Sequence, residues 1–515
     1  MEKKLPYITL DEKAISTLYV DEKPYMAIAG ELHNSSSSSL EFMEERVWPR
    51  LKNMYLDTVL LPVYWENIEP VEGKFDFSLL DGIILQARRE GVRLVLLWFG
   101  LWKNGESHYV PQWVKKDYRR FFRSHYRENH PSDTISPLCQ EAVESDAKAF
   151  SILMNHLREI DGEENTVIMI QVENEIGFLG AERDFSPSAE ASFSDQVPLE
   201  VQASYHCSGN WDEALEEDAP EIFMAYHYAI AVEKIAAAGK AQYPLPMYVN
   251  AWLEQFPERP GSYPSGGPIA KVMPLWQQVA SSIDFFAPDI YLSDFAGVCD
   301  EYTKYNNPLF IPEARRDPIT ASNVFYAVGH YNAMCFSPFG IEDFMDEKFI
   351  ENDVGLTETL NIDWEAFSCQ GTGPYLVKSY KILQNIKEML FKYRGTDQMQ
   401  AFIRKNNHER GCILPLSNCD LQLTYQESKP KKPDSAGIVI EESADCFWVI
   451  GCNVKISVLP KKGSKKFVTI VRLEEGRFEN NIWKPGRVLN GDELRQTTLG
   501  DMPDVRKIKV CLHKT

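Results

Sequence analysis

The chain has 515 residues, of which 44% are hydrophobic, enough for one large domain and a smaller module with a sizeable core. Its formal net charge is -21, from 75 acidic and 54 basic side chains, and this charge repels nucleic-acid backbones and anionic lipid surfaces. Neither nucleic acid nor a membrane is therefore expected as a partner. The charge says nothing about a substrate, because a solvated acidic surface explains most of it.

The ten cysteines are scattered, without a Cys-x-x-Cys pair or a companion histidine spacing. This pattern predicts reduced thiols in a reducing compartment and neither a disulfide framework nor a metal site. Residues 1–10 contain basic side chains but no apolar segment of the kind that a secretory signal needs. We therefore expect a cytoplasmic protein without a metal or other cofactor, although a chain from which a signal peptide had been removed would read the same. The sequence is silent on oligomeric state, and a homo-oligomer is compatible with it.

The first predicted elements begin an alternation of strands and helices. Residues 8–21 combine short apolar pairs with charges and predict an outer strand or cap. Residues 24–34 predict a strand of small side chains that ends with Glu31 and His33. A helix is expected over residues 40–54, where apolar side chains recur on one face.

This alternation continues and predicts a parallel barrel. Eight strands are the number that a (β/α)8 or TIM barrel needs, and the strand-helix order favours a parallel sheet closed by helices. An open doubly wound sheet is an alternative, but no Gly-x-Gly-x-x-Gly turn follows the first strand, so a dinucleotide site is not supported. Strands are expected at 24–34, 58–64, 92–98, 167–172, 246–252, 283–291, 309–313 and 333–336, and further helices at 79–89, 146–160 and 221–238.

The last part of the chain has a different pattern. A helix over 380–393, apolar on one face and stopped at Gly395, closes the barrel. Segments with a period of two then predict a small all-β, sandwich-like domain. We therefore expect a catalytic barrel with an N-terminal extension in residues 1–395 and a C-terminal β domain in residues 396–515. Its expected strands are 421–425, 447–452, 454–459, 467–473 and 505–512.

The fourth predicted strand carries the clearest chemical signal. Residues 167–170 are an apolar run, typical of a parallel strand that is buried on both faces. The strand ends in Glu173, Asn174 and Glu175, which puts carboxylates at the barrel face where active sites are built. Glu173 is expected to point away and to be structural. Glu175 is harder to explain without a function, because burying a charge is costly.

A second carboxylate, Glu313, ends the seventh predicted strand and can face Glu175 across the mouth of a closed barrel. Two carboxylates suit cleavage of a glycosidic bond, since the leaving oxygen needs a proton while the anomeric carbon develops positive charge. Arg315 and Arg316 could keep Glu313 ionised, as a nucleophile requires, and Asn174 could bind a sugar 2-hydroxyl. The alternative is a structural ion pair between Glu313 and Arg315.

Five further side chains are candidates for substrate binding. Tyr291, at the end of the sixth strand, is placed to donate a hydrogen bond to the seventh-strand glutamate. Glu31 and His33 are expected at the mouth, and His33 has no partner histidine at a metal-ligand spacing. Trp98 and Trp252 could form a wall against which a sugar ring stacks, although both could equally belong to the core.

At these residues the chain resembles the clan A glycoside hydrolases and, more narrowly, a divergent branch of glycoside hydrolase family 35, the β-galactosidases. Residues 171–177, Gln-Val-Glu-Asn-Glu-Ile-Gly, are similar to that family's Gln-x-Glu-Asn-Glu-Tyr-Gly motif, with Ile176 replacing Tyr. Ala29-Gly-Glu-Leu-His and the segment that begins Trp65-Glu-Asn-Ile-Glu-Pro resemble the signatures of its first and second strands. The C-terminal β module is similar to the one that accompanies this branch.

The resemblance implies a retaining exo-β-galactosidase that removes terminal β-linked galactose from an oligosaccharide, with Glu175 as acid/base, Asn174 as 2-hydroxyl ligand and Glu313 as nucleophile. The chain departs from the family at residues 98–102, where typical members carry an Ala-Glu pair that grips galactose, and at Pro62, where they carry tyrosine. A β-glucosidase, β-mannosidase or β-arabinosidase is therefore an alternative. A non-catalytic galactoside-binding barrel is another, against which the presence of both glutamates argues.

Overall fold

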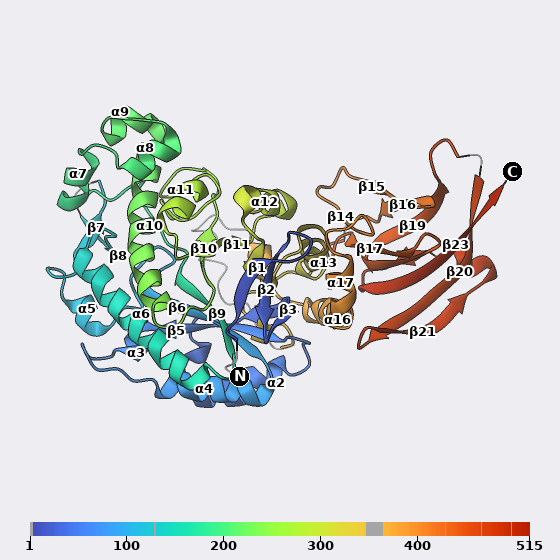
Figure 1. The fold of residues 1–515 in the computed structure, drawn as a ribbon, viewed down its shortest axis with the longest axis horizontal. Coiled ribbons are helices and arrows are strands. Elements are labelled where there is room, and N and C mark those ends of the chain that lie inside the picture. The colour runs from blue at the N-terminus through green and yellow to red at the C-terminus, as the bar shows by residue number, and fades with distance from the viewer. Residues whose placement is uncertain are drawn as a thin grey trace.

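The computed structural model describes residues 4–127, 130–346, 364–427, 429–464, 466–495 and 497–514. A closed barrel surrounded by helices is followed by two β-sheets (Figure 1). All eight expected barrel strands are present, they pair in parallel, and they close in the order β10-β11-β12-β13-β4-β5-β6-β9. They are β4 (Ala27–Glu31), β5 (Thr58–Tyr64), β6 (Arg93–Lys103), β9 (Val167–Asn174), β10 (Met247–Trp252), β11 (Phe285–Ile290), β12 (Phe310–Ala314) and β13 (Cys335–Pro338).

The barrel strands are buried on both faces, which is why their sequences are nearly continuous apolar runs. On β6, Val95 and Leu97 belong to the apolar cluster inside the barrel, whereas Leu96 and Trp98 pack toward the helices. Leu18 from the N-terminal sheet joins the inner cluster. That sheet covers the barrel as the expected cap and consists of the antiparallel strands β1 (Tyr7–Leu10), β2 (Ser16–Val20) and β3 (Lys23–Tyr25).

Helices connect the strands and cover the barrel from outside. The helix expected over 40–54 is interrupted, because a π-helical turn (Met43–Val47) separates α1 (Leu40–Phe42) from α2 (Trp48–Leu51), where Pro49 cannot donate a backbone hydrogen bond. Within the described ranges, no helix is long and apolar enough to cross a lipid bilayer. The main covering helices are α4 (Ser78–Glu90), α6 (Gln140–Asp161), α10 (Ala219–Lys240), α11 (Met273–Val279), α12 (Phe295–Tyr302) and α13 (Thr320–Tyr331).

Short elements occupy the long connections at the C-terminal ends of the strands. The connection after β9 contains three short helices rather than an irregular loop, and a two-stranded sheet lies in the connection after β6. These elements are α3 (Trp65–Ile68), α5 (Gln112–Lys116), β7 (Arg123–His125), β8 (Pro131–Ile135), α7 (Pro187–Phe193), α8 (Leu199–Tyr205), α9 (Trp211–Leu215) and α15 (Trp364–Phe367).

The single helix expected over 380–393 is two helices, α16 (Gly373–Gln384) and α17 (Lys387–Tyr393). The break is at Asn385, whose side-chain and backbone oxygens accept hydrogen bonds of 2.8 and 2.9 Å from the backbone N–H groups of Asn480 and Asn481. Both asparagines lie in the turn between two C-terminal strands. A contact with a distant segment therefore ends the helix, and local periodicity could not reveal it.

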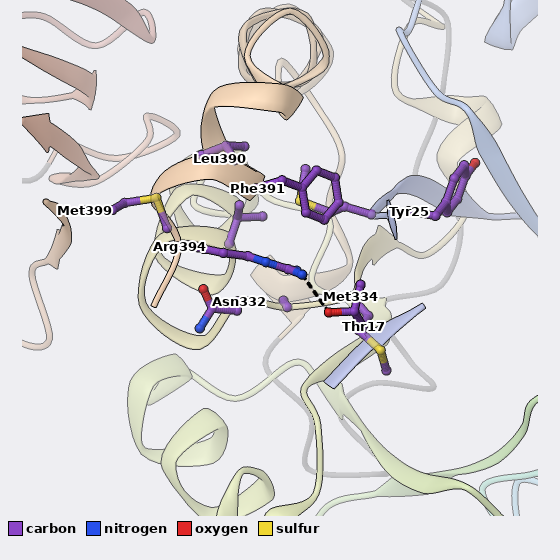
Figure 2. A pocket seen from close by; sticks show the side chains of 11 residues that line it. Thr17, Tyr25, Asn332, Met334, Leu390, Phe391, Arg394 and Met399 are labelled. Carbon is purple, nitrogen blue, oxygen red and sulfur yellow. Dashed lines mark hydrogen bonds between the residues drawn. The ribbon is translucent and has the colours of Figure 1, made fainter. Parts of the chain in front are cut away.

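A small cavity lies where α17 meets the N-terminal sheet (Figure 2). Arg394 extends along it and donates a hydrogen bond of 2.6 Å to the hydroxyl of Thr17, while Tyr25 and Met334 complete its wall. Its volume of about 10 Å³ has room for no more than one water molecule. The cavity belongs to the packing at the N-terminal ends of the strands, because Met334 directly precedes β13.

The C-terminal part is an all-β sandwich, as the sequence predicted. A six-stranded and a four-stranded sheet enclose an apolar cluster that contains Leu421, Val449 and Ile508. Gly329 of α13 lies so close to Ile438 of the sandwich that a Cβ atom would come within 2.6 Å of it, so the barrel and the sandwich are tightly packed. The strands are β14 (Met399–Ile403), β15 (Gly411–Pro415), β16 (Cys419–Tyr425), β17 (Ala436–Ser443), β18 (Cys446–Cys452), β19 (Val454–Pro460), β20 (Lys466–Glu479), β21 (Ile482–Leu489), β22 (Thr498–Leu499) and β23 (Asp504–Lys514).

Candidate active site

Five charged side chains meet at the C-terminal ends of the barrel strands. The ends of β4, β6, β11 and β12 and the residue after β9 supply them, and this is the face where barrel enzymes build their sites. The nearest carboxylate oxygens of Glu175, Asp289 and Glu313 lie within 4.8 Å of one another. Together with Glu31 and Lys103 they form a cluster of four carboxylates and one ammonium group, all buried.

The segment that carries Glu175 is held in a strained conformation. Glu173 and Glu175 have φ angles of +62° and +43°, in the left-handed region that few non-glycine residues adopt. The backbone N–H of Glu175 donates a hydrogen bond of 2.9 Å to Asn250 Oδ1 on β10, and Asn250 Nδ2 donates one of 2.7 Å to Asp289 Oδ2 on β11. Asn250 therefore fixes the position of Glu175 relative to the neighbouring carboxylate.

Lys103 determines the orientation of the Asn174 amide. Its ammonium Nζ donates a hydrogen bond of 2.7 Å to Asn174 Oδ1. The amide nitrogen of Asn174 is then the group left for a ligand, and it has no hydrogen-bond partner among the described residues. An amide that is held in this way presents two N–H donors to whatever binds beside Glu175.

Glu313 has one oxygen engaged and one open. The hydroxyl of Tyr291 donates a hydrogen bond of 2.8 Å to Glu313 Oε2, which confirms the contact expected from the sequence. Glu313 Oε1 has no hydrogen-bond partner within the described part of the chain. The ring of Tyr291 is itself fixed, because it stacks on Phe367 of α15 at a centroid distance of 4.4 Å.

The two arginines that follow Glu313 bind other carboxylates. Arg315 forms a two-bonded pair with Asp317, at 2.7 and 2.9 Å, and Arg316 donates to Asp343 at 2.8 Å. The expected role of these arginines beside Glu313 therefore needs correction. Lys103, which the sequence analysis did not select, is a cation that interacts electrostatically with Glu313.

Burial and the charges of neighbouring carboxylates raise the pKa values of three carboxyl groups in the cluster, those of Glu31, Glu175 and Asp289. Burial and then the charge of Glu313 raise the pKa of Glu175 to about 8, although Lys103 lowers it. The same two causes raise the pKa of Glu31 well above its usual value, and burial together with Glu313 and Glu175 does so for Asp289. The carboxyl group of Glu175 thus holds its proton at neutral pH, as a general acid must.

Three of the carboxylates also resemble a donor set for a divalent cation, since such ions bind several carboxylate oxygens. Lys103 already supplies a positive charge there. Burial would lower the pKa of its amine, but Glu313, Glu175 and Glu31 outweigh this effect and raise it. The ammonium group of Lys103 thus partly compensates the negative charge of the carboxylates.

Of the remaining predicted site residues, Glu31 lies within the cluster, whereas His33 and Trp252 lie outside it. Glu31 is fully buried within the cluster, and neither of its carboxylate oxygens has a hydrogen-bond partner among the described residues. His33 lies just beyond it, where its Nε2 is hydrogen-bonded to Asp343 and its ring packs edge-on against Phe339. Trp252 is half-buried at the end of β10, and its indole N–H donates to Gln255 at 3.2 Å.

Trp98 does not lie at the mouth, so its predicted contact with substrate needs correction. Successive side chains of a strand point to opposite faces, and Trp98 is on the face that packs against α6. Its ring lies 5.7 Å from that of Phe150, and its indole N–H donates a hydrogen bond of 2.8 Å to Asp146. Trp98 therefore belongs to the outer core.

A buried pair of carboxyl groups behind the cluster shapes the end of β6. Residues 99–102 bulge out of register with β9, and this bulge places Lys103 opposite Asn174. Glu173 accepts backbone hydrogen bonds from residues 101 and 102 at 3.2 and 2.7 Å, and Asp146 accepts one from residue 101 at 2.9 Å. Glu173 is therefore structural, as predicted, and it acts together with Asp146.

Sequence reasoning missed Lys103, Asn250 and Asp289. Asn250 and Asp289 lie inside strands that were predicted correctly, and a polar residue in a strand buried on both faces is a usable signal, because its burial is costly. Lys103 gave no such signal, since it follows the bulge and lies beyond the predicted end of its strand.

Comparison with known proteins supports part of this picture. Residues 43–212 match a glycoside hydrolase family 42 model that is described as beta-galactosidase, and residues 376–499 match a domain of unknown function, DUF5597. The first match covers β5, β6 and β9 with Glu175, so this stretch is similar to glycoside hydrolases of clan A. The narrower resemblance to family 35 finds no support in these matches. No curated protein has a sequence similar enough to match.

Two solved structures are among those to which the chain is similar. A cold-adapted beta-galactosidase from Rahnella sp. R3 is 15% identical, with a TM-score of 0.45, over 66% of this chain and 52% of the other. The catalytic domain of a beta-amylase from Paenibacillus polymyxa is 11% identical, with a TM-score of 0.47, over 65% and 97% of the two chains. The chain thus spans about half the length of the Rahnella enzyme. The fold itself, a closed parallel barrel with helices followed by a β-sandwich, is established by the structure of this chain.

Proposed function

We propose that the chain is a retaining β-glycosidase that removes a terminal β-linked galactose from an oligosaccharide. The observation that carries this proposal is the approach of Glu175 and Glu313 across the barrel mouth, with carboxylate oxygens within 4.8 Å. Retaining glycosidases hold their two carboxyl groups about 5 Å apart, whereas inverting enzymes need about 6.5–9.5 Å to fit a water molecule between them.

The two glutamates differ in a way that assigns their roles. Glu175 keeps its proton at neutral pH because its pKa is raised to about 8, so it serves as the acid. Glu313 Oε2 is held by Tyr291, which leaves Oε1 to attack the anomeric carbon. In the first step Glu313 Oε1 forms a bond to that carbon, the glycosidic bond breaks, and the proton of Glu175 passes to the departing oxygen.

The second step reverses these roles. Glu175, now ionised, takes a proton from a water molecule whose oxygen attacks the anomeric carbon, and the bond to Glu313 breaks. The sugar is released with its original anomeric configuration, and Glu175 has regained its proton. The Asn174 amide nitrogen donates to the 2-hydroxyl of the sugar, an interaction that strengthens in the transition state.

The unpaired buried oxygens support a sugar ligand. Glu31 Oε1 and Oε2, Asp289 Oδ1 and Glu313 Oε1 have no hydrogen-bond partner among the described residues. Leaving buried acceptors unpaired costs about 1–3 kcal/mol each. A ring that carries several hydroxyl groups supplies the missing donors, and the low exposure of these side chains suits the terminal residue of a glycan rather than its interior.

A different sugar specificity within clan A is the second candidate. The observation that favours it is Lys103, a cation at the end of the third barrel strand, close to the residues where typical family 35 members carry an Ala-Glu pair. A β-glycoside whose hydroxyl oxygen lies closer to Lys103 than that of galactose would then be the preferred substrate.

A panel of nitrophenyl β-glycosides tests both candidates. The galactoside is expected to be hydrolysed fastest, and faster hydrolysis of the glucoside, mannoside or arabinoside would transfer the assignment to that sugar. Glu313→Gly is expected to abolish hydrolysis and to regain turnover when azide or formate is added, because a small anion can replace the missing carboxylate. Undiminished hydrolysis by this variant would remove Glu313 from the nucleophile role, and no turnover of any glycoside by the wild type would overturn the proposal.

A further inference from the structure

A pocket of about 600 Å³ lies in the seam between the barrel and the C-terminal sandwich. The loop after β12 and α15 form one side, and the loops that connect β14 to β15 and β16 to β17 form the other. This volume is that of a small-molecule site and accommodates one or two sugar rings. Five cationic side chains line it, Arg404, Arg410, Lys429, Lys431 and Lys432, against three carboxylates, Asp317, Glu365 and Glu427.

Lys429 is paired with Asp501 at 3.2 Å, but among the described residues two other lysines of the lining have uncharged partners. Lys431 Nζ donates a hydrogen bond of 2.9 Å to Gln370 Oε1, and Lys432 Nζ donates one of 2.5 Å to the hydroxyl of Tyr375, so the partners of both are uncharged. In a chain whose net charge is -21, a pocket with more cations than carboxylates is unusual. The pocket therefore attracts anions toward one place on an otherwise acidic protein.

Arg404 forms a buried and fixed part of the lining. Its side chain is 4% exposed, and its guanidinium donates to the backbone carbonyls of Gln426, Asn407 and Asn406 at 2.9, 3.2 and 3.3 Å. The carboxylate of Asp434 is 3.6 Å away. Because carbonyl groups hold the guanidinium in place, a ligand does not need to order it, which favours binding.

The pocket and the carboxylate cluster are joined by α15. The backbone N–H of Arg316, in the loop after Glu313, donates to the carbonyl of Ala366 at 2.6 Å. Phe367 of the same helix stacks on Tyr291, the residue that holds Glu313. α15 therefore lies between the two sites, and a saccharide held at the carboxylates would have to pass over this helix to reach the pocket.

We propose that the seam is a second saccharide-binding site and that it takes an anionic sugar residue, carboxylated or sulfated, from the part of the substrate that leaves after cleavage. The proposal rests on the glycosidase function and adds the chemical class of the substrate to it. Guanidinium and ammonium groups bind carboxylate and sulfate groups through charge-assisted hydrogen bonds. Salt weakens such binding when the ligand is partly exposed.

Calorimetric titration of the full chain with three trisaccharides tests the site. The probes are a galacturonate trimer, a sulfated galactose trimer and a neutral galactose trimer. Both anionic trimers are expected to bind more tightly than the neutral one, and binding of only one of them identifies the anionic group. The charge-reversed variant R410E/K431E is expected to weaken anionic binding about tenfold, since it reverses two exposed charges. The matched variant K52E/K484E reverses two exposed lysines outside the pocket and is expected to leave binding unchanged.

The outcomes separate this proposal from the proposed function. Neither variant changes a residue of the carboxylate cluster, so nitrophenyl glycoside hydrolysis is expected to stay at the wild-type rate in both. Equal affinity for the neutral and anionic trimers, no binding of any trimer, or unchanged affinity in R410E/K431E would overturn the anionic site while leaving the glycosidase intact. Charge-dependent binding without hydrolysis of any glycoside would support the anionic site and overturn the glycosidase function.

Discussion

The hydroxyl of Tyr291 donates a hydrogen bond of 2.8 Å to Glu313 Oε2, and no other residue in the described chain is seen to fix this carboxylate. A hydrogen bond to a charged group contributes about 1.5–3 kcal/mol. The hydroxyl thus orients Glu313, the proposed nucleophile, and this suggests a direct test.

Tyr291→Phe is expected to lower kcat about 10- to 100-fold on a nitrophenyl glycoside, because it removes this hydrogen bond. The fold should be retained, since the phenylalanine ring can still stack on Phe367. Tyr118→Phe is the matched control, because Tyr118 is 48% exposed and does not belong to the cluster. Equal kcat values for the two variants would show that the Tyr291 hydroxyl does not support the nucleophile.

The raised pKa of Glu175 predicts the alkaline limit of activity. The protonated acid is present below about pH 8 and is lost as the pH rises through that value. kcat/KM, which reports the free enzyme, should therefore fall tenfold per pH unit above about pH 8. This fall is the alkaline limb of the pH profile. Glu175→Gln should not show it when kcat/KM is measured with a dinitrophenyl glycoside, whose leaving group needs no acid. A limb that persists in this variant would belong to another group.

Lys103 is expected to set the position of that limb. Its charge lowers the pKa of Glu175, so Lys103→Met should move the alkaline limb of kcat/KM upward, by about one pH unit. The variant should also lose rate, because Asn174 loses the hydrogen bond that orients its amide. Lys103→Arg, which keeps the charge, should leave the limb near its wild-type position. A limb that stays in place in Lys103→Met would contradict the electrostatic role of the lysine.

The sequence predicted the barrel strands well because each is buried on both faces and reads as an apolar run bounded by polar residues. Glu175 and Glu313 were found for the same reason, since a carboxylate that directly follows such a run is conspicuous. Asn174 and Tyr291 then followed as their neighbours. The local sequence pattern was sufficient to predict a site residue wherever that residue lay at the end of a predicted strand.

Long-range contacts explain what the sequence did not reveal. Lys103 reaches the cluster only because Asp146 of α6 and Glu173 of β9 hold the bulge at the end of β6. Trp98 was placed at the mouth because the strand was expected to end there, whereas the strand continues to Lys103 and turns Trp98 toward α6. Each miss depends on a partner that is distant in the sequence.

The buried pair of Asp146 and Glu173 is expected to support both stability and activity. Burial raises the pKa of Asp146 to about 6, and burial and then the charge of Asp146 raise the pKa of Glu173 well above its usual value, so the pair shares a proton at neutral pH. Asp146→Ala leaves the indole N–H of Trp98 without its acceptor and should cost about 3 kcal/mol in the free energy of unfolding.

Urea denaturation and kcat/KM measured on the folded variant check this prediction. Asp146→Ala should also lower kcat/KM, because the bulge that places Lys103 loosens. Glu173→Gln should lose less than Asp146→Ala in both measurements, since its amide can donate to Asp146 as the shared proton does and its oxygen can still accept from residue 102. Asp81→Ala, which removes a partly exposed carboxylate, is the control and should change stability by less than about 1 kcal/mol. Equal losses of stability in the Asp146 and Asp81 variants would show that the Asp146–Glu173 pair does not have this supporting role.

Glu31→Gln is expected to make the protein more stable and less active. The pKa of Glu31 is raised by burial and by Glu313, so the folded chain binds a proton that the unfolded chain releases above about pH 4.5. The contribution of Glu31 to stability is therefore most favourable below that pH and becomes less favourable as the pH rises toward the folded-state pKa. Glutamine has no proton to lose, so the advantage of the variant should grow with pH, to about 1–3 kcal/mol at pH 8. Urea midpoints at pH 5 and pH 8 measure this difference. A variant that is less stable than the wild type by the same amount at both pH values would show that Glu31 is not a strained carboxyl group held for binding.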